Sequence, residues 1–150
     1  MAQLGRTIPA LPVRDLVAAV VHYRDRLGFT VLHQDDGFAV LRRDEARVHL
    51  WHADDWSWQQ RQDLRSQPVS SGAESFLAGT ASCRIETEDI DALYAELSRA
   101  DVLHPVSRHG VTETDFGTRE FAELDHDGNL VEFFHWLHDP EAERPQRSLP

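Results

Sequence analysis

Apolar and polar positions alternate most clearly in residues 119–134, where two alternating segments flank the dipeptide Asp127-Gly128. Strict alternation is typical of a strand with one buried face. Asp-Gly is a strong signal for a two-residue type I′ turn, because glycine accepts the positive φ without a Cβ clash. The segment is therefore predicted to be a β-hairpin turning at Asp127-Gly128.

Folding the hairpin about that turn predicts which side chains share a face. Leu124, Val131 and Phe133 are expected on a core face. The other face is expected to carry Arg119, Phe121, Glu123, Asp125, Leu130, Glu132 and Phe134. In this register Glu123 lies directly opposite Glu132, and opposed like charges cost up to about 1 kcal/mol unless a cation offsets them. Arg119, Arg47 and His49 are the candidate cations of the protein, so this face is a candidate site.

The same pattern occurs earlier in the chain. Residues 38–51 align with residues 121–134 without a gap, so that Asp44 falls on Asp127 and His49 on Glu132. A turn at Asp44 places Phe38 opposite Trp51 in the first hairpin. A second match aligns Asp15 with Asp89, with an offset that differs by nine residues. The repeat predicts a duplicated unit with a longer connection inside its second copy.

Each copy is predicted to contain a strand, a helix and three further strands. Asp15 is a helix N-cap, and Gly28 is expected at the C′ position. The helix has an apolar stripe of Leu16, Val20, Tyr23 and Leu27. The preceding strand, residues 7–13, contains Pro9 and Pro12, which places it at a sheet edge or at a crossing between subunits.

The second copy repeats this order. It is predicted to have a strand at residues 81–87, a cap at Asp89, and Leu93 and Leu97 on the apolar face of the helix. The fold class is therefore α+β, with two small modules sharing one core. Residues 1–52 and 79–136 form the modules, residues 53–78 a connecting loop and residues 137–150 a polar tail. The loop contains Trp56 and Trp58, which either contact a ligand or hold the loop on the surface.

Composition narrows the classes of function. The chain has 150 residues, a formal net charge of -11 and one cysteine, Cys83, so no disulfide can form within it. The acidic charge argues against nucleic acid and anionic membranes as partners, and it favours either a cationic ligand or simple solubility. No apolar run is long enough for a membrane span, and we expect a cytoplasmic protein.

Four short motifs resemble those of the glyoxalase, bleomycin-resistance and extradiol-dioxygenase superfamily, also called vicinal oxygen chelate. They are Leu-Pro-Val-Arg-Asp-Leu at 11–16, Tyr-Arg-Asp-Arg-Leu-Gly-Phe at 23–29, Phe-Gly-Thr-Arg-Glu-Phe at 116–121 and Asp-His-Asp-Gly-Asn-Leu at 125–130. The chain looks most like the bleomycin-resistance branch. This resemblance implies two βαβββ modules that form a cupped sheet, and a homodimer in which the N-terminal strand swaps between subunits at Pro9.

The same resemblance implies a function. Bleomycin-resistance proteins bind a cationic, aromatic drug stoichiometrically in a cleft at the dimer interface, without a cofactor. The residues expected to contact a drug of the bleomycin type are aromatic or ionisable. They are Phe38, His49, Trp51, Trp56, Trp58, Phe116, Arg119, Glu123, Glu132 and Phe134.

An enzyme is the alternative. Metal-dependent members of the superfamily take ligands at positions that match Ile8, His49, Ser82 and Glu132. Ile8 has no donor atom and Ser82 is a poor ligand for divalent metals. His49 and Glu132 should approach each other, either as a hydrogen-bonded pair or as the start of a divalent metal site in a glyoxalase, dioxygenase or thiol-transferase. Cys83 is expected to be buried, with no base to activate it.

Overall fold

The computed structural model describes residues 1–53 and 77–138. Its first module contains β1 (Ala10–Val13), α1 (Leu16–Asp25), β2 (Thr30–Gln34), β3 (Phe38–Arg43) and β4 (Ala46–His52). Its second contains β5 (Ser82–Glu86), α2 (Ile90–Arg99), a 3₁₀ turn (Pro105–Ser107), β6 (Thr112–Glu113), β7 (Thr118–Leu124) and β8 (Leu130–Trp136). The predicted α+β class and the duplicated order of elements are confirmed.

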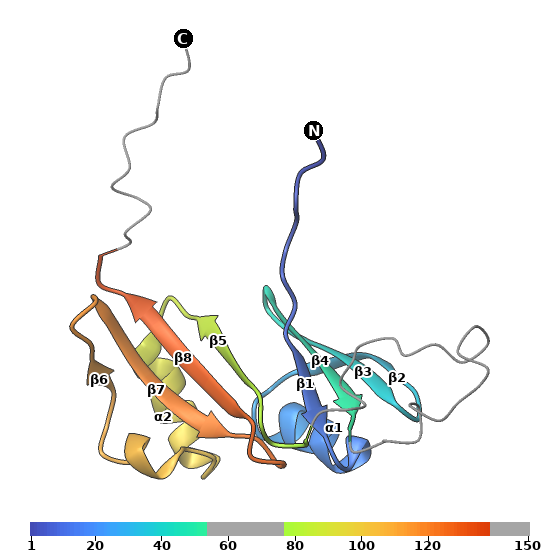
Figure 1. The fold of residues 1–150 in the computed structure, drawn as a ribbon. Coiled ribbons are helices and arrows are strands. Elements are labelled where there is room, and N and C mark those ends of the chain that lie inside the picture. Colours follow the sequence, from blue (N-terminus) through green and yellow to red (C-terminus); the bar gives the residue numbers. More distant parts are fainter. Residues whose placement is uncertain (54–76, 139–150) are drawn as a thin grey trace.

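Each module has one four-stranded mixed sheet, ordered β1-β4-β3-β2 in the first module and β5-β8-β7-β6 in the second. The two sheets lie side by side, with β1 and β5 toward each other and α1 and α2 behind them (Figure 1). We call the sheet side turned away from the helices the open face. No helix in the described ranges is long and apolar enough to cross a membrane.

The first strand and first helix form largely for the predicted reasons. β1 is an edge strand, so its Pro12 does not interrupt a ladder, although the strand starts at Ala10 and not at residue 7. Asp15 caps α1 by accepting a hydrogen bond from Ala18 N at 3.0 Å. The helix ends at the C-cap Arg26, so Leu27 occupies the C′ position, and Gly28, at φ 72°, lies one residue further on than predicted, at C″.

The core lies between the helices and the sheets. The predicted stripe of α1 is buried throughout, and Leu97 of α2 is fully buried. Asp89 caps α2 through Ala92 N at 3.0 Å, as predicted. In β3 and β4, Ala39, Leu41, Val48 and Leu50 point into the core, and the alternate residues point to the open face.

A polar cluster joins the two modules beneath this core. Asp125 accepts a hydrogen bond from the hydroxyl of Tyr23 at 3.0 Å and another from Nδ2 of Asn129 at 2.9 Å. The same amide nitrogen donates to the carbonyl oxygen of Pro12 at 2.9 Å, and Asp127 accepts from the backbone N–H of Arg14 at 2.8 Å. Buried polar groups are tolerated when they are paired, and here the pairing links the modules.

Candidate functional site

The open face of the first module is aromatic. Phe38 pairs with Trp51 across β3 and β4, and their ring centroids are 4.3 Å apart, as the cross-strand prediction requires. His49 meets the edge of Phe38 at 5.1 Å. Partial burial, and then the neighbouring Arg47, lower the pKa of His49, which favours the neutral imidazole at physiological pH. This face therefore combines ring surface with the exposed guanidinium groups of Arg42 and Arg47.

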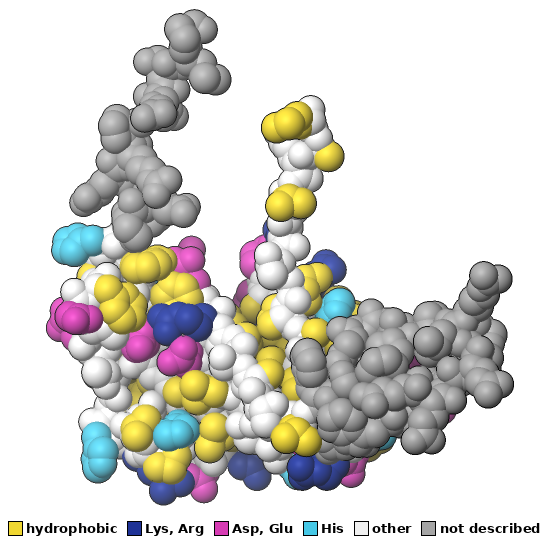
Figure 2. Space-filling model, in the orientation of Figure 1, with side chains coloured by type: hydrophobic (Ala, Val, Ile, Leu, Met, Phe, Trp, Pro, Cys, Tyr) yellow, Lys and Arg dark blue, Asp and Glu magenta, His cyan; other side chains and the backbone are white. Residues whose placement is uncertain are grey.

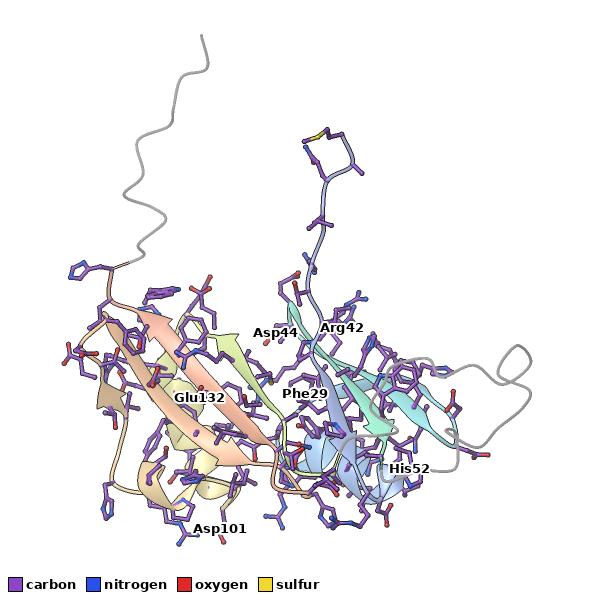
Figure 3. The ribbon with its side chains drawn as sticks, viewed as in Figure 1. Phe29, Arg42, Asp44, His52, Asp101 and Glu132 are labelled. Carbon is purple, nitrogen blue, oxygen red and sulfur yellow. The ribbon has the colours of Figure 1, made fainter. Side chains whose placement is uncertain are left out.

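The open face of the second module combines a ring with charges. Arg84 on β5 donates to Glu132 on β8 at 2.9 Å and to Glu120 on β7 at 2.7 Å. Its guanidinium carbon lies 4.8 Å from the ring centroid of Phe134, and Trp136 meets that ring edge-on at 5.6 Å. Figure 2 shows basic, acidic and hydrophobic side chains adjacent to one another over β7 and β8, and Figure 3 shows Glu132 on β8.

The register of the second hairpin differs from the prediction by one residue. Glu123 pairs with Val131, and Glu132 pairs with Ala122, so Glu123 and Glu132 lie on opposite faces of the sheet. The reason is the loop of residues 125–129, in which the Asp125 carboxylate accepts from the backbone N–H groups of Asp127 and Asn129, each at 2.9 Å. An aspartate that captures two loop amides stabilises this longer loop in place of a two-residue turn. The predicted opposition of two carboxylates is therefore wrong.

Two predicted site residues consequently lie on the helix side of the sheet. Glu123 is 0% exposed, and its Oε2 lies 3.4 Å from Nε2 of His22 on α1. Its Oε1 has no hydrogen-bond partner within the described ranges. Burial, only partly opposed by His22, raises the pKa of Glu123 to about 7. Arg119 binds Asp91 of α2 through paired hydrogen bonds at 2.7 and 3.0 Å. Glu123 and Arg119 therefore cannot contact a ligand bound on the open face.

The remaining predicted site residues lie in different parts of the chain. Phe116 is 58% exposed in the turn before β7. Trp56 and Trp58 lie outside the described residues. Over the described ranges, no hydrogen bond or ion pair joins His49 to Glu132. Each has its own neighbour, Phe38 for His49 and Arg84 for Glu132.

The described residues do not fit the divalent metal site of the enzymatic alternative. Glu132 already accepts from the Arg84 guanidinium, and a divalent cation there would meet a fixed positive charge. Ile8 offers no donor atom, and within residues 1–53 and 77–138 no three His, Cys, Asp or Glu side chains are close enough to share a metal ion. Cys83 is half-buried, and burial together with nearby carboxylates raises its pKa to about 12. We therefore derive no reaction at this site.

Arg84 is the functional candidate that sequence reasoning missed. The match between Asp15 and Asp89 already placed Ala10 and Arg84 at equivalent positions, opposite His49 and Glu132. Parallel pairing of β5 with β8 then brings an arginine directly beside a glutamate. The sequence repeat could have predicted this pair, but only if the first strand of each module had been paired with its last strand.

A groove of about 730 Å³ lies between the modules. Its apolar wall includes Phe29, and its acidic rim includes Asp44 at the tip of the β3–β4 hairpin (Figure 3). The remaining lining residues are Arg43, Glu45, Ala46, Ile85, Glu86, Thr87, Glu88, Asp89, Leu93 and Phe133. The groove is thus apolar inside and negatively charged at its edge.

Paired modules of this kind, each with a helix-backed sheet and an open face, define a known class. The chain belongs to the glyoxalase/bleomycin resistance protein/dioxygenase superfamily, whose family model matches residues 4–133. Within it, the chain is 48% identical over 129 residues to the bleomycin resistance proteins of Staphylococcus aureus and Geobacillus stearothermophilus. These matches cover 86% of this chain and 95% of each relative.

Solved structures agree with this assignment. The bleomycin-binding protein of Streptomyces verticillus, complexed with copper(II)-bleomycin, is 30% identical with a TM-score of 0.66, and the match covers 89% of this chain and 97% of that one. The lactoylglutathione lyase of Agrobacterium tumefaciens has a TM-score of 0.69 at 17% identity, with 90% and 96% of the two chains covered. At that lower identity the likeness concerns the fold alone.

Proposed function

We propose that this protein binds drugs of the bleomycin type and confers resistance by sequestering them stoichiometrically. The observation that carries the proposal is the 48% identity to bleomycin resistance proteins along nearly their whole length. The 30% identity to a bleomycin-binding protein solved with its drug supports the same ligand.

The open faces support this assignment physically. A planar ring system can stack on the Phe38 and Trp51 pair, and aromatic contacts of this kind contribute roughly 0.5 to 1.5 kcal/mol beyond buried area. The net charge of -11 favours encounter with a cationic drug. The proposed contacts are Phe38, His49, Trp51, Phe116, Glu132 and Phe134, with Trp56 and Trp58 as candidates in the connecting loop.

We further propose a homodimer in which residues 1–8 of one chain reach the other. In this chain the N-terminal segment extends away from both modules, and Met1 and Leu4 are exposed (Figure 1). The segment also carries Arg6, whose guanidinium lies 2.9 Å from the carboxylate of Glu45 on the acidic rim of the groove in the same chain. In the proposed dimer Arg6 pairs instead with the acidic rim of the partner's groove, and the apolar residues of the segment contact its apolar wall.

Calorimetric titration with metal-free and copper-loaded bleomycin tests the function. We expect about one drug molecule per chain with a Kd of roughly micromolar or tighter. Trp51→Ala should weaken binding roughly tenfold through lost stacking. Val17→Ala, an exposed change on α1, is the matched control and should leave binding unchanged. Absence of binding at tens of micromolar would remove the proposal.

Metal analysis separates sequestration from the enzymatic alternative. Protein purified without chelator should hold less than about a tenth of a metal ion per chain, and it should not take up more when a divalent metal is added. A stoichiometric metal that depends on His49 and Glu132 would instead favour an enzyme.

Light scattering tests the dimer separately. Deleting residues 1–8 should shift the protein toward monomer at low micromolar concentration, because the exchanged contacts are lost. Deleting residues 143–150 removes an equally long segment and should leave the dimer intact. If the N-terminal deletion remains dimeric, the exchange is wrong even where drug binding persists.

A further inference from the structure

Arg84 occupies the part of the second open face that a cationic aromatic ligand would use. Three groups hold its guanidinium there: the carboxylates of Glu120 and Glu132, at 2.7 and 2.9 Å, and the ring of Phe134, at 4.8 Å. Carboxylates and ring faces are the groups that bind an organic cation in proteins. Part of their binding capacity is therefore already used within the chain.

The first module shows what the same position looks like without this cation. Ala10 stands opposite His49 as Arg84 stands opposite Glu132, in the same parallel pairing. A methyl group cannot cover the rings of β3 and β4. The duplicated modules therefore present two different faces. Within residues 1–53 and 77–138, only the second face has a guanidinium stacked on a ring, that of Arg84 on Phe134.

We propose that Arg84 is a specificity-determining residue, a built-in competitor that limits how tightly the second open face holds cationic aromatic ligands. A compact planar cation must displace the guanidinium to reach Phe134, Glu120 and Glu132. Only a ligand with further contacts elsewhere compensates for that displacement. The inference deepens the proposed function, since it supposes that ligands of this class are the ones the protein meets.

The competition arises from charge and position together. With Arg84 in place, the trio of Arg84, Glu120 and Glu132 carries one net negative charge, and without it the two carboxylates carry two. Side chains of the trio are only partly exposed, at 38%, 20% and 28% respectively, so water screens them incompletely. Removing the guanidinium should therefore strengthen cation binding at this face specifically.

Acridine orange, a planar aromatic cation, is a suitable probe by fluorescence titration. Arg84→Gln should raise its affinity about tenfold, the size of one cation–π contact or one charge-assisted hydrogen bond. Arg99→Gln is the matched control, because Arg99 lies exposed in the last turn of α2, away from both open faces, and its loss changes the net charge equally. That control should change the affinity less than about twofold.

Two further variants make the test decisive. Arg84→Lys keeps the positive charge and should stay within about threefold of the wild type. Adding Phe134→Ala to Arg84→Gln should abolish the gain. The proposal is overturned if Arg84→Gln leaves affinity unchanged or lower, if Arg99→Gln or Arg84→Lys matches its gain, or if the gain survives loss of Phe134.

Bleomycin itself distinguishes failure of this inference from failure of the proposed function. If the wild type binds bleomycin but Arg84→Gln does not alter acridine orange binding, only the role of Arg84 is wrong. If bleomycin does not bind while Arg84→Gln gains acridine orange affinity as expected, the competitor exists and the drug assignment is wrong.

Discussion

Replacing Glu123 by Gln should stabilise the protein at neutral and alkaline pH. Glu123 is fully buried between β7 and α1, with His22 at 3.4 Å and one oxygen lacking a partner in the described structure. Tyr23, Asp125 and the half-buried Cys83 also face it, and none of these adds a positive charge. A glutamine has the same shape and can still hydrogen-bond to His22, but it never has to be ionised inside the core.

The shifted pKa sets the magnitude and the pH window. Burial raises the pKa of Glu123 from 4.5 to about 7, so the folded protein retains this proton where the unfolded chain has lost it. The stability associated with Glu123 is therefore present below pH 4.5, falls as pH rises from 4.5 to 7, and levels off above pH 7. At about 1.4 kcal/mol for each pKa unit, the loss approaches about 3 kcal/mol. Glu123→Gln should recover most of it at pH 8.

Urea and thermal unfolding between pH 4.5 and 8 measure the effect. At pH 8 the variant should melt roughly 6–10 °C above the wild type, and the two curves should converge toward pH 4.5. Drug affinity should not change, because Glu123 lies on the helix side of the sheet. Glu113→Gln, at an exposed position of β6, is the control and should show no such convergence.

The explanation fails if Glu123→Gln destabilises the protein at pH 8. It also fails if the stability gain is the same at every pH, because the effect would then not come from ionisation. Weaker drug binding with unchanged stability would indicate that Glu123 contacts the ligand, which contradicts its position on the helix side of the sheet.

Three further outcomes follow from the structure. Gly79→Ala should lose about 2 to 3 kcal/mol of unfolding free energy in urea, because Gly79 has φ 77° and a Cβ there would clash with the backbone oxygen of Asp127. Asn129→Ala should cost about 3 kcal/mol in the same assay, since it removes the acceptor of the Ala81 N–H and the shorter of the two hydrogen bonds to the carbonyl of Pro12. Cys83 should react with iodoacetamide at pH 8 roughly a thousandfold more slowly in the folded than in the unfolded protein, because its pKa is raised to about 12.

The elements of the fold were predictable because local signals agreed with the periodicity. Asp15 and Asp89 cap the helices as expected, and the stripe that includes Leu16 and Tyr23 is buried. Local signals suffice where a capping side chain satisfies orphan amides within its own turn. The duplicated arrangement of strands followed from the repeat.

The face of each residue in the second hairpin was harder to predict. Asp127-Gly128 predicts a two-residue turn, but the competing signal was Asp125, whose side chain bonds two amides of a five-residue loop. The first hairpin does close with a two-residue turn, at Asp44-Glu45, where no glycine is present. A shift of one residue moves every side chain of one arm to the other face, and Glu123 and Arg119 were misplaced for that reason alone.

The aromatic pair Phe38 and Trp51 was predicted correctly because its turn was also correct. Arg84 was missed because its partners come from strands 36 and 48 residues away. Long-range ion pairs depend on sheet order, which periodicity does not specify.

The loop at residues 125–129 also determines how the protein comes apart. It belongs to the second half of the chain, yet its side chains satisfy the Pro12 carbonyl, the Tyr23 hydroxyl and the Arg14 amide of the first half. Either half expressed alone would expose part of its apolar surface to water. It would also lose the hydrogen bonds that join the two halves. We therefore expect a single unfolding transition whose calorimetric and van't Hoff enthalpies agree. The two duplicated modules are therefore expected to unfold as one cooperative unit, so the spacing between their two open faces is held until the whole chain melts.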